Sequence, residues 1–171
     1  LAAAGLLCVG KVGCSRWSHF AMLRRAPSAA AFFLAGGAEV LVILTGEEVR
    51  HLSVFSDAAG ALQIPHDGIG RDYAPTLLAD EEEAGHFVLV QRLLDGSGVA
   101  EYRVLRGVCS DDARLAWSGE PGRVLGAPWR SCEAPPVVAA RGDSLFFALS
   151  KSRRCRCDVS TGTFSVSEPF A

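Results

Sequence analysis

The chain has 171 residues, of which 49% are hydrophobic and 21% are charged, a composition that is typical of a globular protein and excludes a disordered one. Its formal net charge of −2 provides no basic excess of the kind that binds nucleic acid, so we expect no nucleic-acid partner. Eighteen glycines and eight prolines interrupt helices and favour a chain that turns often.

The first segment, residues 1–27, is predicted to be a helical leader. Residues 2–25 contain no proline, and large apolar side chains recur there at near-helical spacing until Pro27 ends the helix. The apolar run 1–9 is too short to span a bilayer, and the run 29–44 is interrupted by two glycines and a glutamate. We therefore expect no membrane insertion.

The remainder, residues 28–171, is predicted to be an antiparallel all-β domain. Runs of β-branched and aromatic residues recur along it, and turn residues, most often glycine, separate them. The predicted strands cover residues 39–45, 49–55, 86–93, 101–108, 114–117, 137–140, 144–149, 153–159 and 163–166. Short strands with a turn roughly every ten residues indicate the all-β class.

A weak internal repeat suggests how these strands are grouped. Residues 54–64 and 156–166 share one strand-turn-strand plan, with Gly60 and Gly162 at corresponding positions, and residues 87–119 form a middle unit. Three units at intervals of roughly fifty residues are typical of the blades of a kelch-type β-propeller. Because three blades cannot close a ring, the expected propeller is partial or degenerate. The alternative is a β-sandwich with ordinary hairpins.

The six cysteines are predicted to be reduced structural thiols. No C-x-x-C pair occurs, so their spacing does not match a zinc site, and a chain of this length does not need disulfides. Cys155 and Cys157 lie two residues apart, which in a strand places both side chains on one face as small apolar groups. This use of cysteine favours an intracellular compartment.

No arrangement of residues typical of catalysis is found in the sequence. The four histidines lie in separate contexts, and neither a nucleophile elbow nor a phosphate-binding loop occurs, so we expect no enzyme, no metal and no cofactor. The acidic run 80–83 is predicted to be a solvated loop. The alternative is an enzymatic or ligand-binding β domain with a dispersed site, for which the first candidates are His51, His66, Asp67 and Asp72.

Four residues are predicted to contact a protein partner. In a strand, Arg154 and Arg156 share one face, and two neighbouring guanidinium groups suit carboxylates or phosphates. Protection of an edge strand is an equally good explanation of these arginines. Trp129 and Tyr73 lie in loop-like segments beside prolines, and both residue types are common interface anchors, with core packing as the alternative.

Three stretches of the chain are similar to motifs of a known protein family. Residues 14–20 (Cys-Ser-Arg-Trp-Ser-His-Phe) and the basic, Pro-containing stretch that follows are similar to the end of an F-box. Residues 142–147 (Gly-Asp-Ser-Leu-Phe-Phe) and 157–162 (Cys-Asp-Val-Ser-Thr-Gly) are similar to the F-box-associated β domain. Together these motifs resemble those of grass F-box proteins, which implies an F-box remnant in 1–27 and an F-box-associated domain in 28–171.

The resemblance also implies a function. It predicts a substrate-recognition module of an SCF-type ubiquitin ligase, without a cofactor, in the cytoplasm or nucleus. The Leu-Pro start of an F-box is absent, so a Skp-type adaptor is expected only if the full-length product completes the motif. A truncated, non-functional family copy is the alternative, because the chain starts at Leu1 and residues 1–13 are rich in glycine.

Overall fold

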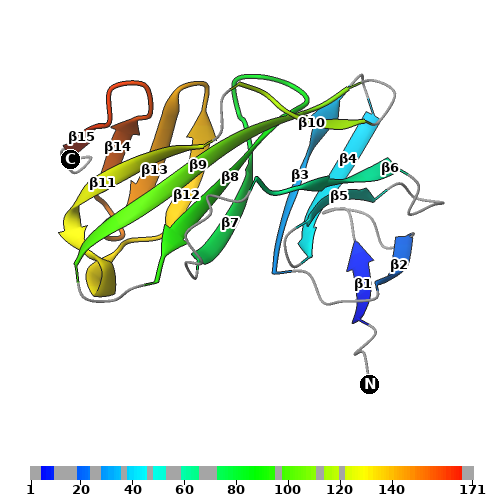
Figure 1. Cartoon of the computed structure of the whole chain (residues 1–171), viewed down its shortest axis with the longest axis horizontal. Helices are drawn as coiled ribbons and strands as arrows, with labels where there is room; N and C mark the ends of the chain where they lie inside the picture. The colour runs from blue at the N-terminus through cyan, green and yellow to red at the C-terminus, as the bar shows by residue number, and fades with distance from the viewer. Residues whose placement is uncertain are drawn as a thin grey trace.

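A computed structural model of the chain contains fifteen strands and one short 3-10 helix in the residues that it describes (Figure 1). The described residues are 5–9, 19–23, 28–35, 38–45, 48–52, 59–65, 73–94, 98–110, 114–119 and 122–166. The strands pair antiparallel throughout, which confirms the predicted antiparallel all-β class. Two of them, β1 (Gly5–Val9) and β2 (His19–Leu23), form a separate hairpin.

The predicted helical leader is therefore wrong at the described residues of segment 1–27. Gly5 lies opposite Leu23 in the β1–β2 ladder, where a helix was expected. Glycine costs about 1 kcal/mol relative to alanine inside a helix, and the segment carries Gly5, Gly10 and Gly13 within nine residues. A short apolar run between glycines is compatible with a strand as well as with a helix. The rest of the predicted leader lies outside the described residues.

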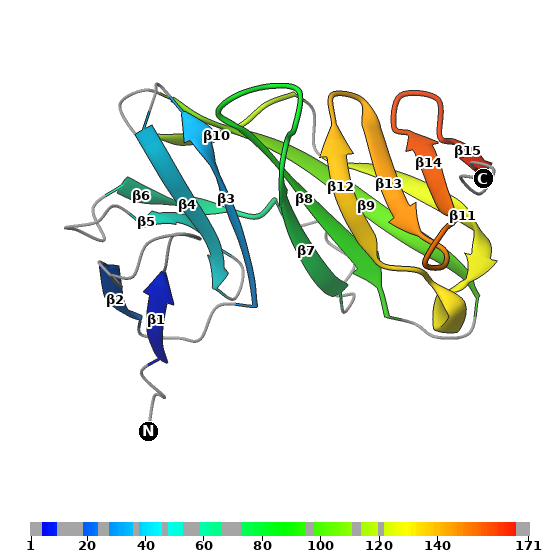
Figure 2. The same cartoon turned by 180° about the vertical axis from the view of Figure 1, so that it is seen from behind.

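The other strands form three consecutive sheets, in each of which the chain meanders from one strand to its neighbour (Figures 1 and 2). The first sheet contains β3 (Ala29–Ala35), β4 (Ala38–Thr45), β5 (Glu48–Leu52) and β6 (Ala59–Gln63). The middle sheet contains β7 (Tyr73–Ala79), β8 (His86–Leu93), β9 (Val99–Cys109) and β10 (Leu115–Trp117), and β11 (Arg123–Arg130) pairs with β9. After the 3-10 helix η1 (Ser131–Glu133), the third sheet contains β12 (Val137–Arg141), β13 (Ser144–Ala148), β14 (Arg154–Asp158) and β15 (Thr163–Val166).

The sheets pack so that strands with the same position in their sheets, first or fourth, lie next to one another. The opening strand of the middle sheet, β7, contacts both β3 and β12, and Asp80 forms a parallel bridge with Ala140. At the other end of the strand order, β6 contacts β10, where the indole N–H of Trp117 donates to the Gln63 carbonyl at 2.8 Å. Among the described strands no sheet closes on itself.

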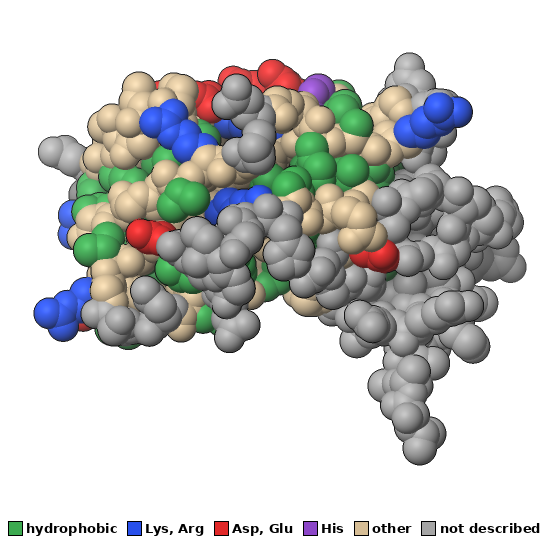
Figure 3. Space-filling model, viewed as in Figure 1, with side chains coloured by type: hydrophobic (Ala, Val, Ile, Leu, Met, Phe, Trp, Pro, Cys, Tyr) green, Lys and Arg blue, Asp and Glu red, His purple; other side chains and the backbone are tan. Residues whose placement is uncertain are grey.

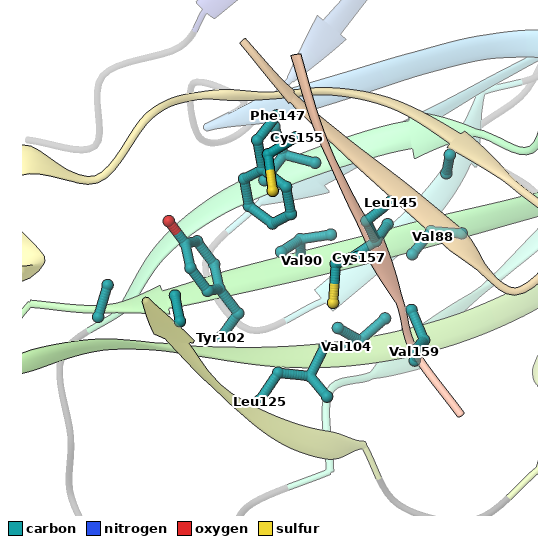
Figure 4. Close-up of a cluster of buried hydrophobic side chains, with 14 residues drawn as sticks. Val88, Val90, Tyr102, Val104, Leu125, Leu145, Phe147, Cys155, Cys157 and Val159 are labelled. Carbon is teal, nitrogen blue, oxygen red and sulfur yellow. The ribbon is translucent and has the colours of Figure 1, made fainter. Parts of the chain in front are cut away.

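The middle sheet buries both of its faces. Along β8, Phe87 and Leu89 point toward the first sheet, whereas Val88 and Val90 point toward the third, because neighbouring residues of a strand face opposite sides. Figure 4 shows the cluster between the middle and third sheets, into which Tyr102 and Phe147 project. Burying one such side chain completely stabilises a fold by about 1.5–3 kcal/mol, so these two clusters hold the three sheets together.

One glycine makes the packing against the first sheet possible. Gly107 in β9 lies opposite Phe87 in β8 and opposite Trp117 in β10. The Phe87 ring occupies the space that a Cβ atom at residue 107 would need, and it lies 5.8 Å from the Trp117 ring, centroid to centroid. Only glycine fits below this ring.

Replacing Gly107 by alanine is expected to destabilise the protein by about 1–3 kcal/mol, because the new methyl group must displace a completely buried ring. Urea unfolding measures the change. Gly126→Ala in β11 is the matched control, since a Cβ atom there meets no atom within 4 Å and should change stability by less than about 0.5 kcal/mol. Equal stability of the two variants would contradict this account of the packing.

Candidate protein-binding surface

Strand β14 separates a buried face from a basic one. Cys155 and Cys157 are buried, and Arg154 and Arg156 are exposed, which confirms the predicted division of the two faces. Burial raises the pKa of both thiols, that of Cys157 to about 11. Because β14 lies between β13 and β15, its arginines do not protect a sheet edge, and that explanation is wrong.

The arginines belong to the outer face of the third sheet, which is nearest the viewer in Figure 2. Arg156 lies between Phe146 of β13 and Ser165 of β15, and its Nε donates to Ser144 Oγ at 2.9 Å. Phe146 is half-buried, and the Arg141 guanidinium lies 5.7 Å from its ring centroid. We call the set Arg141, Ser144, Phe146, Arg154 and Arg156 the outer arginine face.

Charge is divided between the two ends of this face. At the β13–β14 turn, Lys151, Arg153 and Arg154 are all exposed, and residues 144–157 contain no acidic residue. At the opposite end, acidic side chains follow the upper edge of the molecule in Figure 3, where Figure 1 has the β7–β8, β12–β13 and β14–β15 connections. The third sheet therefore has a basic end at the β13–β14 turn and an acidic end at the β12–β13 and β14–β15 turns.

The acidic end is organised around Asp80, whose side chain is only 1% exposed. Its Oδ1 accepts hydrogen bonds from the backbone N–H groups of Glu82 at 2.9 Å, Glu83 at 3.3 Å and Gly142 at 3.0 Å. Arg106 lies near Asp80 Oδ2 at 4.0 Å and donates to Asp143 at 2.9 Å. The predicted solvated loop at 80–83 is therefore wrong for Asp80, which ties two turns together.

A second carboxylate shapes the β14–β15 turn. Asp158 Oδ1 accepts hydrogen bonds from the Ser160 hydroxyl at 2.7 Å and from the Thr161 N–H and hydroxyl at 2.8 and 2.9 Å. These bonds, that from Ser160 first, lower the Asp158 pKa to about 2. Gly162 completes the turn with φ +72°, a conformation that favours glycine. The turn motif at 157–162 thus has a structural explanation of its own.

Trp129 and Tyr73 lie apart from the outer arginine face. Trp129 is half-buried in β11, donates its indole N–H to the Tyr102 hydroxyl at 3.1 Å and packs on Phe147 from the inner side of the third sheet. Tyr73 begins β7 opposite Leu93 and is half-buried. Both are in strands and not in the loops predicted for them. Of the four predicted partner contacts, only Arg154 and Arg156 share one surface.

Prolines explain why the sequence predicts loops where the structure has strands β7 and β11. Pro75 is tolerated in β7 because β7 is the terminal strand of the middle sheet. Pro128 lies within the register irregularity of β11 between Gly126 and Arg130, where a ladder hydrogen bond is not required. Within strands β7 and β11, proline therefore marks a sheet edge and a bulge, respectively.

The predicted dispersed site falls largely outside the described residues. That is true of His66, Asp67 and Asp72 and of the side chain of His51, whose backbone belongs to β5. Within the part of the chain that the structure describes, no group of three or more His, Cys, Asp or Glu side chains could hold a metal ion. The same part contains no helix with the length and apolar character needed to traverse a lipid bilayer.

The Asp158 turn generates a pH-dependent prediction. Because the folded-state pKa of about 2 lies below the ordinary value of 3.8, ionised Asp158 stabilises the fold above about pH 4, and this stabilisation is lost as the pH falls toward 2. Asp158→Asn keeps an acceptor oxygen but not the charge. We expect its deficit in unfolding free energy, measured in urea, to be constant from about pH 5 to 7 and to shrink below about pH 4.

The exposed Glu133 of η1 provides the control, since Glu133→Gln also removes one surface carboxylate. A deficit of Asp158→Asn that is the same at about pH 2.5 and pH 7 would show that the charge of Asp158 has no role in the turn.

Comparisons with known proteins identify no relative of this chain. No protein-family model, no curated protein and no solved structure matches the chain. The resemblance to F-box proteins therefore stays a prediction from the sequence motifs.

Proposed function

We propose that this protein is a protein-binding module and that the outer arginine face is its docking surface. One observation carries the proposal: Arg154 and Arg156 project side by side from a strand whose other face is fixed in the core by Cys155 and Cys157. Arginine forks match carboxylates in geometry as well as in charge. The half-buried Phe146 adds an aromatic contact of the kind common in protein interfaces.

The stacking of the sheets supports a propeller-like scaffold for this surface. Three consecutive meanders lie with first strand beside first strand, and the opening strands β7 and β12 run parallel at the Asp80–Ala140 bridge. Blades of a propeller pack in this way around their axis, with a four-stranded meander in each blade. On this proposal the chain contributes three blade-like sheets of a partial or degenerate propeller.

The wider role that we propose is substrate recognition in an SCF-type ubiquitin ligase, in the cytoplasm or nucleus. The support is the resemblance of residues 14–20, 142–147 and 157–162 to F-box proteins. The adaptor would be of the Skp type if the full-length product completes the F-box, and the outer arginine face would bind the protein to be ubiquitinated.

Charge reversal tests the docking surface. The double variant Arg154→Glu, Arg156→Glu is expected to lose at least 90% of partner recovery in a pull-down, because each substitution replaces attraction for a carboxylate by repulsion. Thermal unfolding checks that the double variant is folded, and a small decrease in stability is expected, because Arg156→Glu removes the hydrogen bond to Ser144 and places a carboxylate two residues from Asp158. Arg114→Glu, an exposed arginine before β10, is the control. Full recovery by a folded double variant would remove these arginines from the docking surface.

Affinity purification of the full-length product from its native cells tests the ligase assignment. We expect a Skp-type adaptor and a cullin to co-purify, identified by mass spectrometry, with the substrate among the remaining proteins. If a soluble, folded full-length product brings down neither, the ligase assignment is wrong.

A further inference from the structure

The outer arginine face also defines the chemistry of its partner. Resting on the proposed protein-binding function, we propose that the face binds an extended peptide segment that carries two carboxylates at alternate positions, i and i+2. The segment lies along β14, and its carboxylates pair with Arg154 and Arg156.

The spacing of the two arginines carries this inference. Arg154 and Arg156 are separated by one residue on a regular strand, so their backbone positions are about 6.7 Å apart. An extended peptide repeats its side chains on one face at the same distance, since every second residue points the same way. Carboxylates at i and i+2 therefore reach both guanidinium groups together, whereas adjacent carboxylates point to opposite sides of the peptide.

The surroundings of the arginines favour this arrangement. On the same face, Ala148 lies beside Arg154, and Phe146 and Ser165 lie on the two sides of Arg156, so a peptide along β14 would meet an aromatic ring next to the second arginine. Ser144 accepts the Arg156 Nε–H, which orients that guanidinium before a ligand arrives. The ion pair of Arg141 with Glu81, Nε to Oε2 at 2.5 Å, is an example on the same face of an arginine that takes a carboxylate.

The acidic end of the face favours a short acidic peptide over a polyanion. Asp158 follows Arg156 by two residues on the same side of β14, and Asp143 and Glu81 belong to the turns beyond it. Asp158 lies about 6.7 Å from Arg156 along the strand, within a Debye length of roughly 8 Å, so it repels a ligand whose negative charge continues past Arg156. A nucleic acid strand continues its charge in both directions, whereas a peptide with two carboxylates need not.

Two peptide isomers test the inference on the intact chain. One heptapeptide contains Glu-Thr-Glu and the other Glu-Glu-Thr in the same flanking sequence, so that net charge and composition are identical. Titration of the ¹⁵N-labelled protein is followed by NMR at the arginine Nε–Hε signals and the β14 amides. We expect millimolar binding of the Glu-Thr-Glu peptide and at least threefold weaker binding of its isomer.

Variants and a second ligand complete the test. Arg156→Gln should weaken binding of the Glu-Thr-Glu peptide at least threefold and remove the preference between isomers, whereas Arg114→Gln should change neither. Equal affinity of the isomers for the wild type would overturn the spacing argument. Tighter binding of a single-stranded trinucleotide with two phosphodiesters than of the Glu-Thr-Glu peptide would also overturn the inference, in favour of a nucleic acid ligand.

The two proposals fail in different ways. If the pull-down partner depends on Arg154 and Arg156 but the peptide isomers bind equally, protein binding stands and only the i, i+2 spacing is wrong. If the pull-down is insensitive to reversal of both arginines, the docking surface itself is wrong and the peptide inference fails with it.

Discussion

Burial of the middle sheet on both faces is the constraint on which the rest of the structure depends. A sheet that buries only one face can leave polar side chains on the other, but β8 and β9 carry apolar side chains on both. The first and third sheets must each cover one of these faces. Because the third sheet uses its inner face for this contact, its outer face is left to present Arg154 and Arg156.

Polar contacts between turns fix the third sheet more specifically than apolar packing can. Asp80, almost completely buried, bonds to the β12–β13 turn, and Arg106 reaches both Asp80 and Asp143. Asp143 in turn accepts the backbone N–H of Ser160 at 2.9 Å. A buried carboxylate without these partners would cost several kcal/mol, so the network specifies one alignment of the turns as well as stabilising it.

The sequence predicts those features of the fold and of the candidate site that depend on neighbouring residues, but not those that depend on contacts between residues distant in the chain. The faces of β14 followed from strict alternation of Cys and Arg, and the turns at Gly142 and Gly162 followed from glycine between apolar runs. Strands β7 and β11 were missed because a proline lies in each, and a proline's tolerance depends on the sheet edge or bulge around it. The buried role of Asp80 was hidden in a run of four acidic residues, since its partners at Arg106 and Gly142 are distant in the chain.

Buried and exposed side chains alternate along the five residues of β14, so neighbouring positions are under different structural constraints. Cys155 and Cys157 are constrained by the shape of the core between the middle and third sheets, whereas Arg154 and Arg156 lie on the exposed face, where Arg156 donates to Ser144 Oγ. Substitutions at the exposed positions of such a strand change stability little, so they are open to mutation while the fold is retained. The exposed side chains of β14 could therefore change one at a time during evolution, without passing through an unstable intermediate.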